Sequence, residues 1–474
     1  MRSSTVNRGS LKRRVLAVLL VLMGAEPCRA GGLFLPVHGV RALGRGGTSA
    51  AGGDDPAAMW FNPATLDVAA GQGLFEGVLI SGNQRYRRID SGGNEYGEVA
   101  SMTPLQAAPT AATVFRLPRR FSLGAAFSSP YGLSPRYRPD GPQRYSLIDL
   151  DGTFIARVEL GVAYRILENG PDGPRLAVGL SLQDTLVNFE ARTVLNACPG
   201  TVVAAPEDPE CDSRVRFRMG ANFNVSGHVG GLLSYGRLRT GLAVQLPTWV
   251  SGWGTIEAGI PTHPLFRHED GSVKATQEGD RAKMTLRLPW VLRAAVEYRF
   301  TPRLRAEAGL DYEGWSLHDA IRVTPKDIKL TNLNGGVPEY EVGPVTIWRK
   351  FRDTVAVRTG AEWDVHPLVV LRGGIVYESA APPPKFLSLL SVDMPKVAIT
   401  AGFGLRPHPA WRIDGGYAFI SEWTTTVPLV ADPSVDTASC QLAPIRPEAP
   451  CVQVNAGTYK QSVHVGGLSV TYAF

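Results

Sequence analysis

The most extended regular pattern in the chain is an alternation of apolar and polar side chains. Between Arg214 and Gly227 the apolar residues occupy the odd positions, while Arg, Asn and Ser fill most of the even ones. A similar alternation runs from Arg281 to Phe300. A period of two predicts β-strands, and these runs exceed the roughly five or six residues of most soluble strands. We therefore predict strands that cross a membrane, with the apolar face toward lipid and the Arg residues toward the lumen of a barrel.

Fourteen segments are predicted as strands. They are residues 73–89, 109–117, 121–133, 153–166, 174–191, 214–234, 238–257, 282–300, 304–322, 350–364, 368–380, 394–406, 410–424 and 459–474. Short connections such as Pro118–Arg120 alternate with long ones, and the last strand ends on Phe474. This arrangement is typical of bacterial outer-membrane barrels, whose short turns lie in the periplasm. The sequence predicts an all-β fold, a 14-stranded antiparallel transmembrane β-barrel of the Gram-negative outer membrane.

The N-terminal residues differ from the rest of the chain. A basic start, an apolar run from Val15 to about Ala25 and the sequence Cys28-Arg29-Ala30 predict a signal peptide over residues 1–30. The apolar run is too short to span a bilayer as a helix. The predicted domains are therefore this signal peptide, residues 31–72 and the barrel at 73–474.

Residues 31–72 are predicted to form a plug, or hatch, of short helices. Asp55-Pro56 and Asn62-Pro63 each place a capping residue before a proline, as at the start of a helix. A barrel of this size has more interior than its own side chains fill. The apolar side chains that would seal it are Leu33, Phe34, Leu35, Met59, Trp60, Phe61 and Leu66.

The segment Gly39–Leu66 resembles the N-terminal hatch of the FadL/TodX (OmpP1) family of outer-membrane transporters, including its Asn-Pro-Ala sequence at 62–64. Weaker matches are Ser129–Leu133, Leu288-Pro289 and Leu371–Tyr377. The resemblance implies a monomer that passively carries long-chain fatty acids or aromatic hydrocarbons from a pocket beside the hatch to a lateral exit near a kinked third strand. The residues it implies are Trp60, Phe61, Asn62, Pro63, Ala64, Leu33 and Phe34 at the ligand, and Ser129, Pro130, Tyr131 and Gly132 at the lateral gate.

Four cysteines remain after the signal peptide, in two close pairs within polar loops. In an exported chain, Cys198 with Cys211 and Cys440 with Cys451 predict two disulfides that each close a small loop. Free thiols are the alternative. The apolar residues of two other long loops are candidates for a ligand landing patch, the alternative being that they pack against the barrel rim; they are Ile260, Leu265, Phe266, Phe386, Leu387, Leu389 and Leu390.

Charge and chemistry narrow the function further. The net charge is +6, but the Arg residues are spread along the strands, which argues against nucleic-acid binding. No Gly-x-Ser-x-Gly elbow is present, and His263 and His268 form only an isolated pair. We expect no enzyme activity, cofactor or metal, although a lipid hydrolase with a spatial triad remains a distant alternative.

Two functions stay open at this point. The favoured one is passive uptake of hydrophobic molecules, and the alternative is a general porin or surface-structural barrel with a merely stabilising plug. The expected partners are a hydrophobic small molecule and the lipids and lipopolysaccharide of the outer membrane. Fatty acids, alkanes, toluene-like rings and quorum-signal lipids all fit an apolar pocket.

Overall fold

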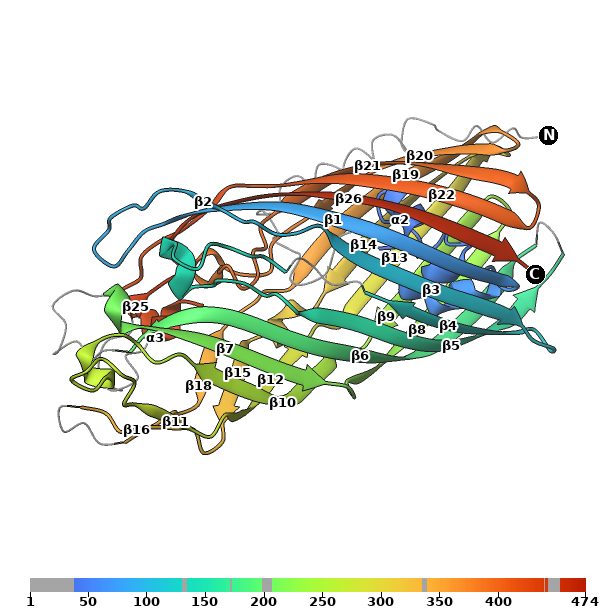
Figure 1. The fold of residues 1–474 in the computed structure, drawn as a ribbon. Coiled ribbons are helices and arrows are strands. Elements are labelled where there is room, and N and C mark those ends of the chain that lie inside the picture. Colours follow the sequence, from blue (N-terminus) through green and yellow to red (C-terminus); the bar gives the residue numbers. More distant parts are fainter. Residues whose placement is uncertain are drawn as a thin grey trace, which may run out of the picture.

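A closed barrel of fourteen antiparallel strands makes up most of the molecule (Figure 1). This computed structural model describes residues 38–129, 134–170, 173–197, 207–334, 339–438, 440–441 and 452–474. The barrel closes between its first and last strands, which pair from Gln72 with Ala473 to Arg88 with Gly457. The prediction of a 14-stranded transmembrane barrel is confirmed.

Each wall strand overlaps one of the predicted segments. The continuous ones are β1 (Gln72–Arg88), β3 (Gln106–Arg116), β4 (Phe121–Ser128), β5 (Phe154–Glu168), β6 (Arg175–Asn196), β19 (Thr354–His366), β20 (Val369–Glu378), β21 (Lys396–His408), β22 (Trp411–Glu422) and β26 (Gly457–Ala473). The interrupted ones are β7 (Asp212–Ala221) with β8 (Val225–Tyr235), β9 (Leu238–Gln245) with β10 (Thr248–Ala258), β12 (Arg281–Leu288) with β13 (Val291–Thr301), and β14 (Leu304–Glu313) with β15 (Ala320–Pro325).

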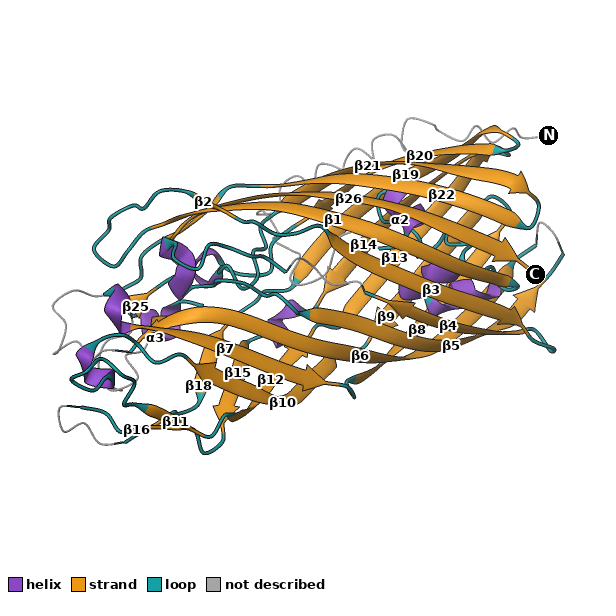
Figure 2. Cartoon of the chain, in the orientation of Figure 1, coloured by secondary structure: helices purple, strands orange, loops and turns teal. Residues whose placement is uncertain are grey.

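Short helices lie in two places, inside the barrel and in the long loops (Figure 2). Those inside are α2 (Val40–Gly44), η1 (Pro56–Trp60) and η2 (Pro63–Asp67). The loops carry η3 (Pro142–Tyr145), η4 (Pro209–Cys211), η5 (Pro264–Phe266), η7 (Pro384–Phe386) and α3 (Pro433–Asp436), and η6 (Trp315–Leu317) lies at the interruption between β14 and β15. No helix in the described part of the chain is long and apolar enough to cross a membrane.

Minor strands extend the loops beyond the wall. They are β2 (Val99–Ala100), β11 (Thr276–Glu278), β16 (Lys329–Thr331), β17 (Tyr340–Glu341), β18 (Val345–Trp348), β23 (Thr425–Val427), β24 (Cys440–Gln441) and β25 (Val452–Gln453). β18 pairs with β15 and so continues the wall outward. We call β7, β10, β12 and β15 the outer segments, and β8, β9, β13 and β14 the inner segments.

The interruption between β12 and β13 reverses which side chains face the lumen. In β13 the charged Arg293 is buried, whereas Val296 is exposed on the outside. In β12, beyond Pro289, the apolar Leu288 is buried and Arg287 is exposed. Because successive side chains of a strand point to opposite faces, inserting residues that do not pair shifts this alternation.

The same reversal occurs in the two neighbouring strands. Arg218 of β7 is exposed and Met219 is buried, while below the break Val225 is exposed on the outer face of β8. Asn224 closes the break, since its Nδ2 donates to the carbonyl oxygens of Thr185 (2.6 Å) and Ala221 (3.2 Å). In the next strand, Pro247 separates β9 from β10.

These reversals correct the predicted orientation of two long segments. In the segments Arg214–Ala221 and Arg281–Leu288 the apolar side chains face the lumen. The Arg side chains that alternate with them in each segment face outward. The prediction that apolar residues face lipid holds for the inner segments. The prediction failed because the alternation in the sequence does not reveal that an interruption changes its phase.

Candidate functional site

The hatch is locked to the barrel wall through Asn62, which is fully buried. Its Nδ2 donates to the carbonyl oxygens of Ala50 (2.9 Å) and Gly231 (3.0 Å), and its Oδ1 accepts from the backbone N–H of Ala64 (3.0 Å). Asn62 is thus the N-cap of η2 and also joins η2 to β8. Every polar atom of this amide is used within the protein, and contact between Asn62 and a ligand stays a prediction.

Two wall glycines give the Asn-Pro-Ala turn its room. A Cβ added at Gly230 would lie 2.1 Å from Asn62 Oδ1, and one at Gly179 would lie 2.3 Å from the backbone carbonyl carbon of Pro63. Any larger side chain at these positions would push the turn away from the wall. The close approach therefore depends on residues of β6 and β8 as well as on the hatch sequence.

Buried ion pairs hold the other side of the hatch. Arg45 Nη2 lies 2.9 Å from both Glu297 Oε2 and Glu307 Oε2, and Arg41 Nη2 lies 3.1 Å from Glu362 Oε1. All five side chains are almost fully buried. Since a buried charge without its partner is costly, these pairs fix the hatch relative to β13, β14 and β19.

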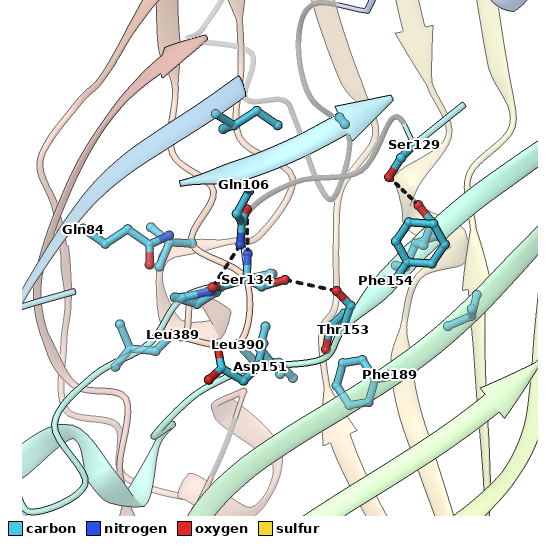
Figure 3. Close-up of a pocket in the computed structure, with 18 of the residues that line it drawn as sticks. Gln84, Gln106, Ser129, Ser134, Asp151, Thr153, Phe154, Phe189, Leu389 and Leu390 are labelled. Carbon is cyan, nitrogen blue, oxygen red and sulfur yellow. Dashed lines mark hydrogen bonds between the residues drawn. The ribbon is translucent and has the colours of Figure 1, made fainter. Parts of the chain in front are cut away.

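A cavity of about 420 Å³ lies in the barrel beyond the hatch (Figure 3). It is enclosed by strands of the wall and by loop residues that include Leu389 and Leu390. The apolar part of its lining consists of Ile80, Pro104, Ala107, Ala108, Leu150, Phe154, Ile155, Val187, Phe189, Val250, Met284, Leu286, Leu288, Ile321, Leu389, Leu390, Val392, Ile420 and Val463. A lining of this kind suits a hydrophobic molecule.

The hatch and the cavity share one apolar cluster. Trp60 and Phe61 of the hatch belong to the same buried cluster as Val187 and Met284, which line the cavity. The guanidinium of Arg157 lies 3.9 Å from the centre of the Trp60 ring and holds it by a cation–π contact. A movement of the hatch would therefore change the packing beside the cavity.

One corner of the cavity lining is polar. Arg349 is 1% exposed and donates to the hydroxyl oxygens of Ser388 (3.2 Å) and Ser391. Among the described residues, no carboxylate lies within ion-pair distance of its guanidinium, and its Nε has no hydrogen-bond partner. Burial lowers the pKa of Arg349 to about 10, a change that Asp393 opposes, so the group stays charged at neutral pH.

His318 adds a second polar atom to this corner. Its Nδ1 donates to the carbonyl oxygen of Arg287 (2.7 Å), while its Nε2 is buried and has no hydrogen-bond partner among the described residues. Burial, and next the charge of Arg349, lower the pKa of His318 to about 3, so the ring is neutral at pH 7. Both side chains contact the ring of Phe351. The corner thus offers a cation and a neutral imidazole to a ligand.

The cavity reaches the barrel wall where the hydrogen-bonded ladder is interrupted. β4 ends at Ser128, which pairs with Thr110 on one side and Arg157 on the other. Further out, β3 pairs with β1 and β5 pairs with β6, but no described residue of β4 joins them. Phe154, which lines the cavity here, is 44% exposed on the outside.

Side-chain hydrogen bonds join described residues on either side of the end of β4 (Figure 3). Ser129 Oγ donates to the carbonyl oxygen of Ile155 (2.9 Å), and Gln106 Nε2 donates to that of Ser134 (3.2 Å). β4 is described from Phe121 to Ser128, and residues 130–133 of the predicted strand lie outside the described residues. A few side-chain hydrogen bonds close the wall less firmly than a continuous ladder does.

The remaining predicted site residues are placed as follows. Pro63 and Ala64 are buried in η2 against the wall. Leu33, Phe34, Pro130, Tyr131, Gly132, Cys198 and Cys451, together with the signal peptide at 1–30, lie outside the described residues. Cys211 is buried and Cys440 belongs to β24, and both disulfides stay predictions.

The predicted landing patch is not exposed. Leu265 and Phe266 are buried together in a loop cluster, and Leu387 and Leu389 are buried in another. The alternative, packing against the rim, describes them better. Sequence reasoning missed Arg349 and His318, since nothing in the spacing of isolated polar residues reveals that they meet at one cavity.

The apolar outer belt, the plugged lumen and the closed sheet define an integral protein of the Gram-negative outer membrane. Residues 21–474 match the family described as outer membrane protein transport protein (OMPP1/FadL/TodX), and the chain belongs to this family. It is a family of outer-membrane channels for hydrophobic compounds. No curated protein matches the chain.

Solved structures share the fold. A Pseudomonas aeruginosa FadL homologue is 17% identical, with a TM-score of 0.67, over 94% of this chain and 100% of its own. The P. putida toluene transporter TodX is 16% identical with a TM-score of 0.61 (93% and 99% covered). The Ralstonia pickettii toluene transporter TbuX is 17% identical with a TM-score of 0.58 (93% and 99% covered).

Proposed function

We propose that the protein takes up amphiphilic hydrophobic molecules, such as long-chain fatty acids, passively across the outer membrane. The ligand occupies the cavity beyond the hatch and leaves sideways through the wall between β3 and β5. The observation that carries the proposal is that the apolar cavity extends to Ser129 and Phe154, at the interruption of the ladder. Solved relatives described as toluene transporters support a hydrophobic cargo.

The polar corner favours an acid over a hydrocarbon. Arg349 has two serine hydroxyls but no carboxylate partner among the described residues, whereas Lys396, the other cation of the lining, lies 2.6 Å from Asp393. A carboxylate head group would give the Arg349 guanidinium the anion it lacks, with a charge-assisted hydrogen bond. The alkyl chain would then lie along the apolar lining.

Covalent closure of the wall tests the exit. Cysteines in place of Ser129 and Ile155 would join β5 to the end of β4 across the interruption when oxidised. We expect oxidation to lower oleate uptake by about tenfold or more, and reductant to restore it. The matched control replaces Phe121 and Tyr164, which pair where the ladder is intact. Unchanged uptake after complete oxidation of the Ser129–Ile155 pair would overturn lateral exit.

Removal of the hatch distinguishes a transporter from a porin. Deletion of residues 31–66 is expected to abolish or deregulate oleate passage, because the hatch packs beneath the cavity. If oleate passage stays unchanged while ion conductance rises, the hatch only blocks a pore, and the porin alternative is correct.

A further inference from the structure

The outward reversal of the outer segments creates a basic surface above the membrane belt. β7, β10, β12 and β15 lie side by side in this order (Figure 1). The outward positions of β7, β12 and β15 carry cations that we call the basic face: Arg216, Arg218, Arg281, Lys283, Arg287 and Arg322. Arg216 and Arg218 pair with Glu190, and Arg322 pairs with Asp319, so the three cations of β12 carry the unpaired charge of this face.

Strand register makes this surface continuous and places it beside aromatic rings. Trp249 of β10 pairs with Arg287, and Trp253 pairs with Lys283. Both Trp side chains are exposed, at 58% and 48%. Exposed Trp residues mark the level of lipid head groups in membrane barrels. The cations of β12 therefore stand at and just outside the head-group level.

The three cations of β12 have no ion-pair partner in the part of the chain that the structure describes. Among the described residues, no carboxylate lies within 4.0 Å of the side-chain nitrogens of Arg281, Lys283 or Arg287. The guanidinium of Arg281 instead lies 5.2 Å from the centre of the Trp253 ring. These three cations share the outward face of β12 with Thr285 and present hydrogen-bond donors along it.

The opposite side of the barrel shows what paired surface cations look like. On β1 and β26, Arg85 and Lys460 lie 3.6 Å and 3.4 Å from Glu98, and Arg87 lies 3.6 Å from Glu95. These cations are also exposed at the outer end of their strands. The missing carboxylates are therefore a property of β12 and not of outer strand ends in general.

We infer that the basic face binds the phosphorylated head group of lipopolysaccharide, the anionic lipid of the outer leaflet. Arg and Lys donors match phosphate oxygens, and basic residues next to an interface attract anionic head groups. The Trp rings would lie against the sugar and the upper part of the acyl chains. Charge complementarity and the position beside the apolar belt select a lipid phosphate as the occupant.

The experiment compares two triple variants of the full-length protein in a nonionic detergent. The first is Arg281→Gln, Lys283→Gln and Arg287→Gln, and the control is Arg85→Gln, Arg87→Gln and Lys460→Gln. Binding of purified lipopolysaccharide, of its enzymatically dephosphorylated form and of inorganic phosphate would be measured for each protein at constant ionic strength.

We expect the β12 variant to bind lipopolysaccharide at least about tenfold more weakly, since each basic residue near an anionic surface adds to the attraction. The control variant should stay within about twofold of the unmodified protein, and dephosphorylated lipid should bind all three proteins equally weakly.

Equal lipopolysaccharide binding by both variants would overturn the inference. Tight binding of dephosphorylated lipid by the unmodified protein would also overturn it. Competition by inorganic phosphate at millimolar concentration would overturn it too, because it would indicate a site for free anions. Oleate uptake by the β12 variant should not change, so the result is independent of the proposed transport.

Discussion

The inner and outer segments of the same four strands have opposite polarities. In the inner segments the lumen holds ion pairs such as Arg45 with Glu297 and Glu307, and the outside is apolar. In the outer segments the lumen is apolar and lines the cavity, and the outside carries Arg and Lys. One barrel thus combines a polar lumen that fixes a hatch with an apolar lumen that accepts a ligand.

The difference shows that the surroundings of the wall, and not the barrel itself, determine which face is apolar. Lipid surrounds the inner segments, so their outer side chains are apolar and their charges must pair inside. The outer segments stand at and above the head groups, where exposed charges are tolerated. Their apolar side chains can therefore turn inward and form a binding cavity.

The largest effect is expected from breaking the ion pairs of the inner lumen. Glu297→Gln with Glu307→Gln leaves Arg45 buried without a carboxylate, which costs about 3–5 kcal/mol. We expect the hatch to detach, seen as higher conductance in planar bilayers and faster proteolysis within residues 38–66. Glu98→Gln, on the outer surface, is the control and should change neither quantity.

The second largest effect is expected from a lysine on the outside of β6, whose cost in stability should differ between the level of the inner segments and that of the outer segments. Leu180 and Asn188 both point outward on β6, and both are exposed. Leu180→Lys puts a charge into lipid and should destabilise the barrel by about 2–4 kcal/mol. Asn188→Lys lies at the outer level and should change stability by less than about 1 kcal/mol. Urea unfolding in lipid vesicles measures the free energy of unfolding of both variants. Equal losses of stability would contradict a boundary between a lipid level and an outer level of the wall.

A change in the polar corner of the cavity should lower the uptake of acids and leave the uptake of hydrocarbons unchanged. Arg349→Gln is expected to lower oleate uptake by about tenfold, the loss expected from one charge-assisted hydrogen bond, while toluene uptake stays within twofold. Lys350→Gln is the control, because this neighbouring cation pairs with Asp319 and does not line the cavity. A parallel loss for oleate and toluene would show that Arg349 supports the loops and does not select the cargo.

The smallest effect is expected for the dependence of local stability around His318 on pH. Burial and Arg349 lower the pKa of His318 from 6.5 to about 3. The unfolded segment therefore takes up a proton before the folded one, so this stability is complete above about pH 6.5 and is lost as the pH falls toward 3. Amide hydrogen exchange at residues 315–323, corrected for its intrinsic rate, should be less protected at pH 4.5 than at pH 7.5. His318→Gln should remove most of this difference, and a variant that keeps it would assign the effect to another group.

Much of the fold could be predicted because it depends on local patterns. The period of two, the short turns and the terminal Phe474 predicted the number and order of the strands. The paired capping residues and prolines predicted the short helices η1 and η2. The prediction failed where phase mattered, at residues 222–224 and at Pro289, since the sequence there does not say which face the next residues take.

The candidate site was less accessible to sequence reasoning. Asn62 was recognised by resemblance, but its partners Ala50 and Gly231 are distant in the chain. Arg349 and His318 look like ordinary loop residues until Phe351 brings them together at the cavity. A cavity is a property of several strands and loops at once, and no single segment encodes it.

The sequence by itself therefore determined the barrel, the hatch and the family, because alternation, turns and caps act over a few residues and the Asn-Pro-Ala turn is a specific signature. Only the tertiary structure decided which strand faces line the lumen, that β4 is described between β3 and β5 only as far as Ser128, and that Arg349, unlike Lys396, meets no carboxylate among the described residues. These features depend on register and on the packing of loops over the barrel, which bring together residues that are far apart in the chain.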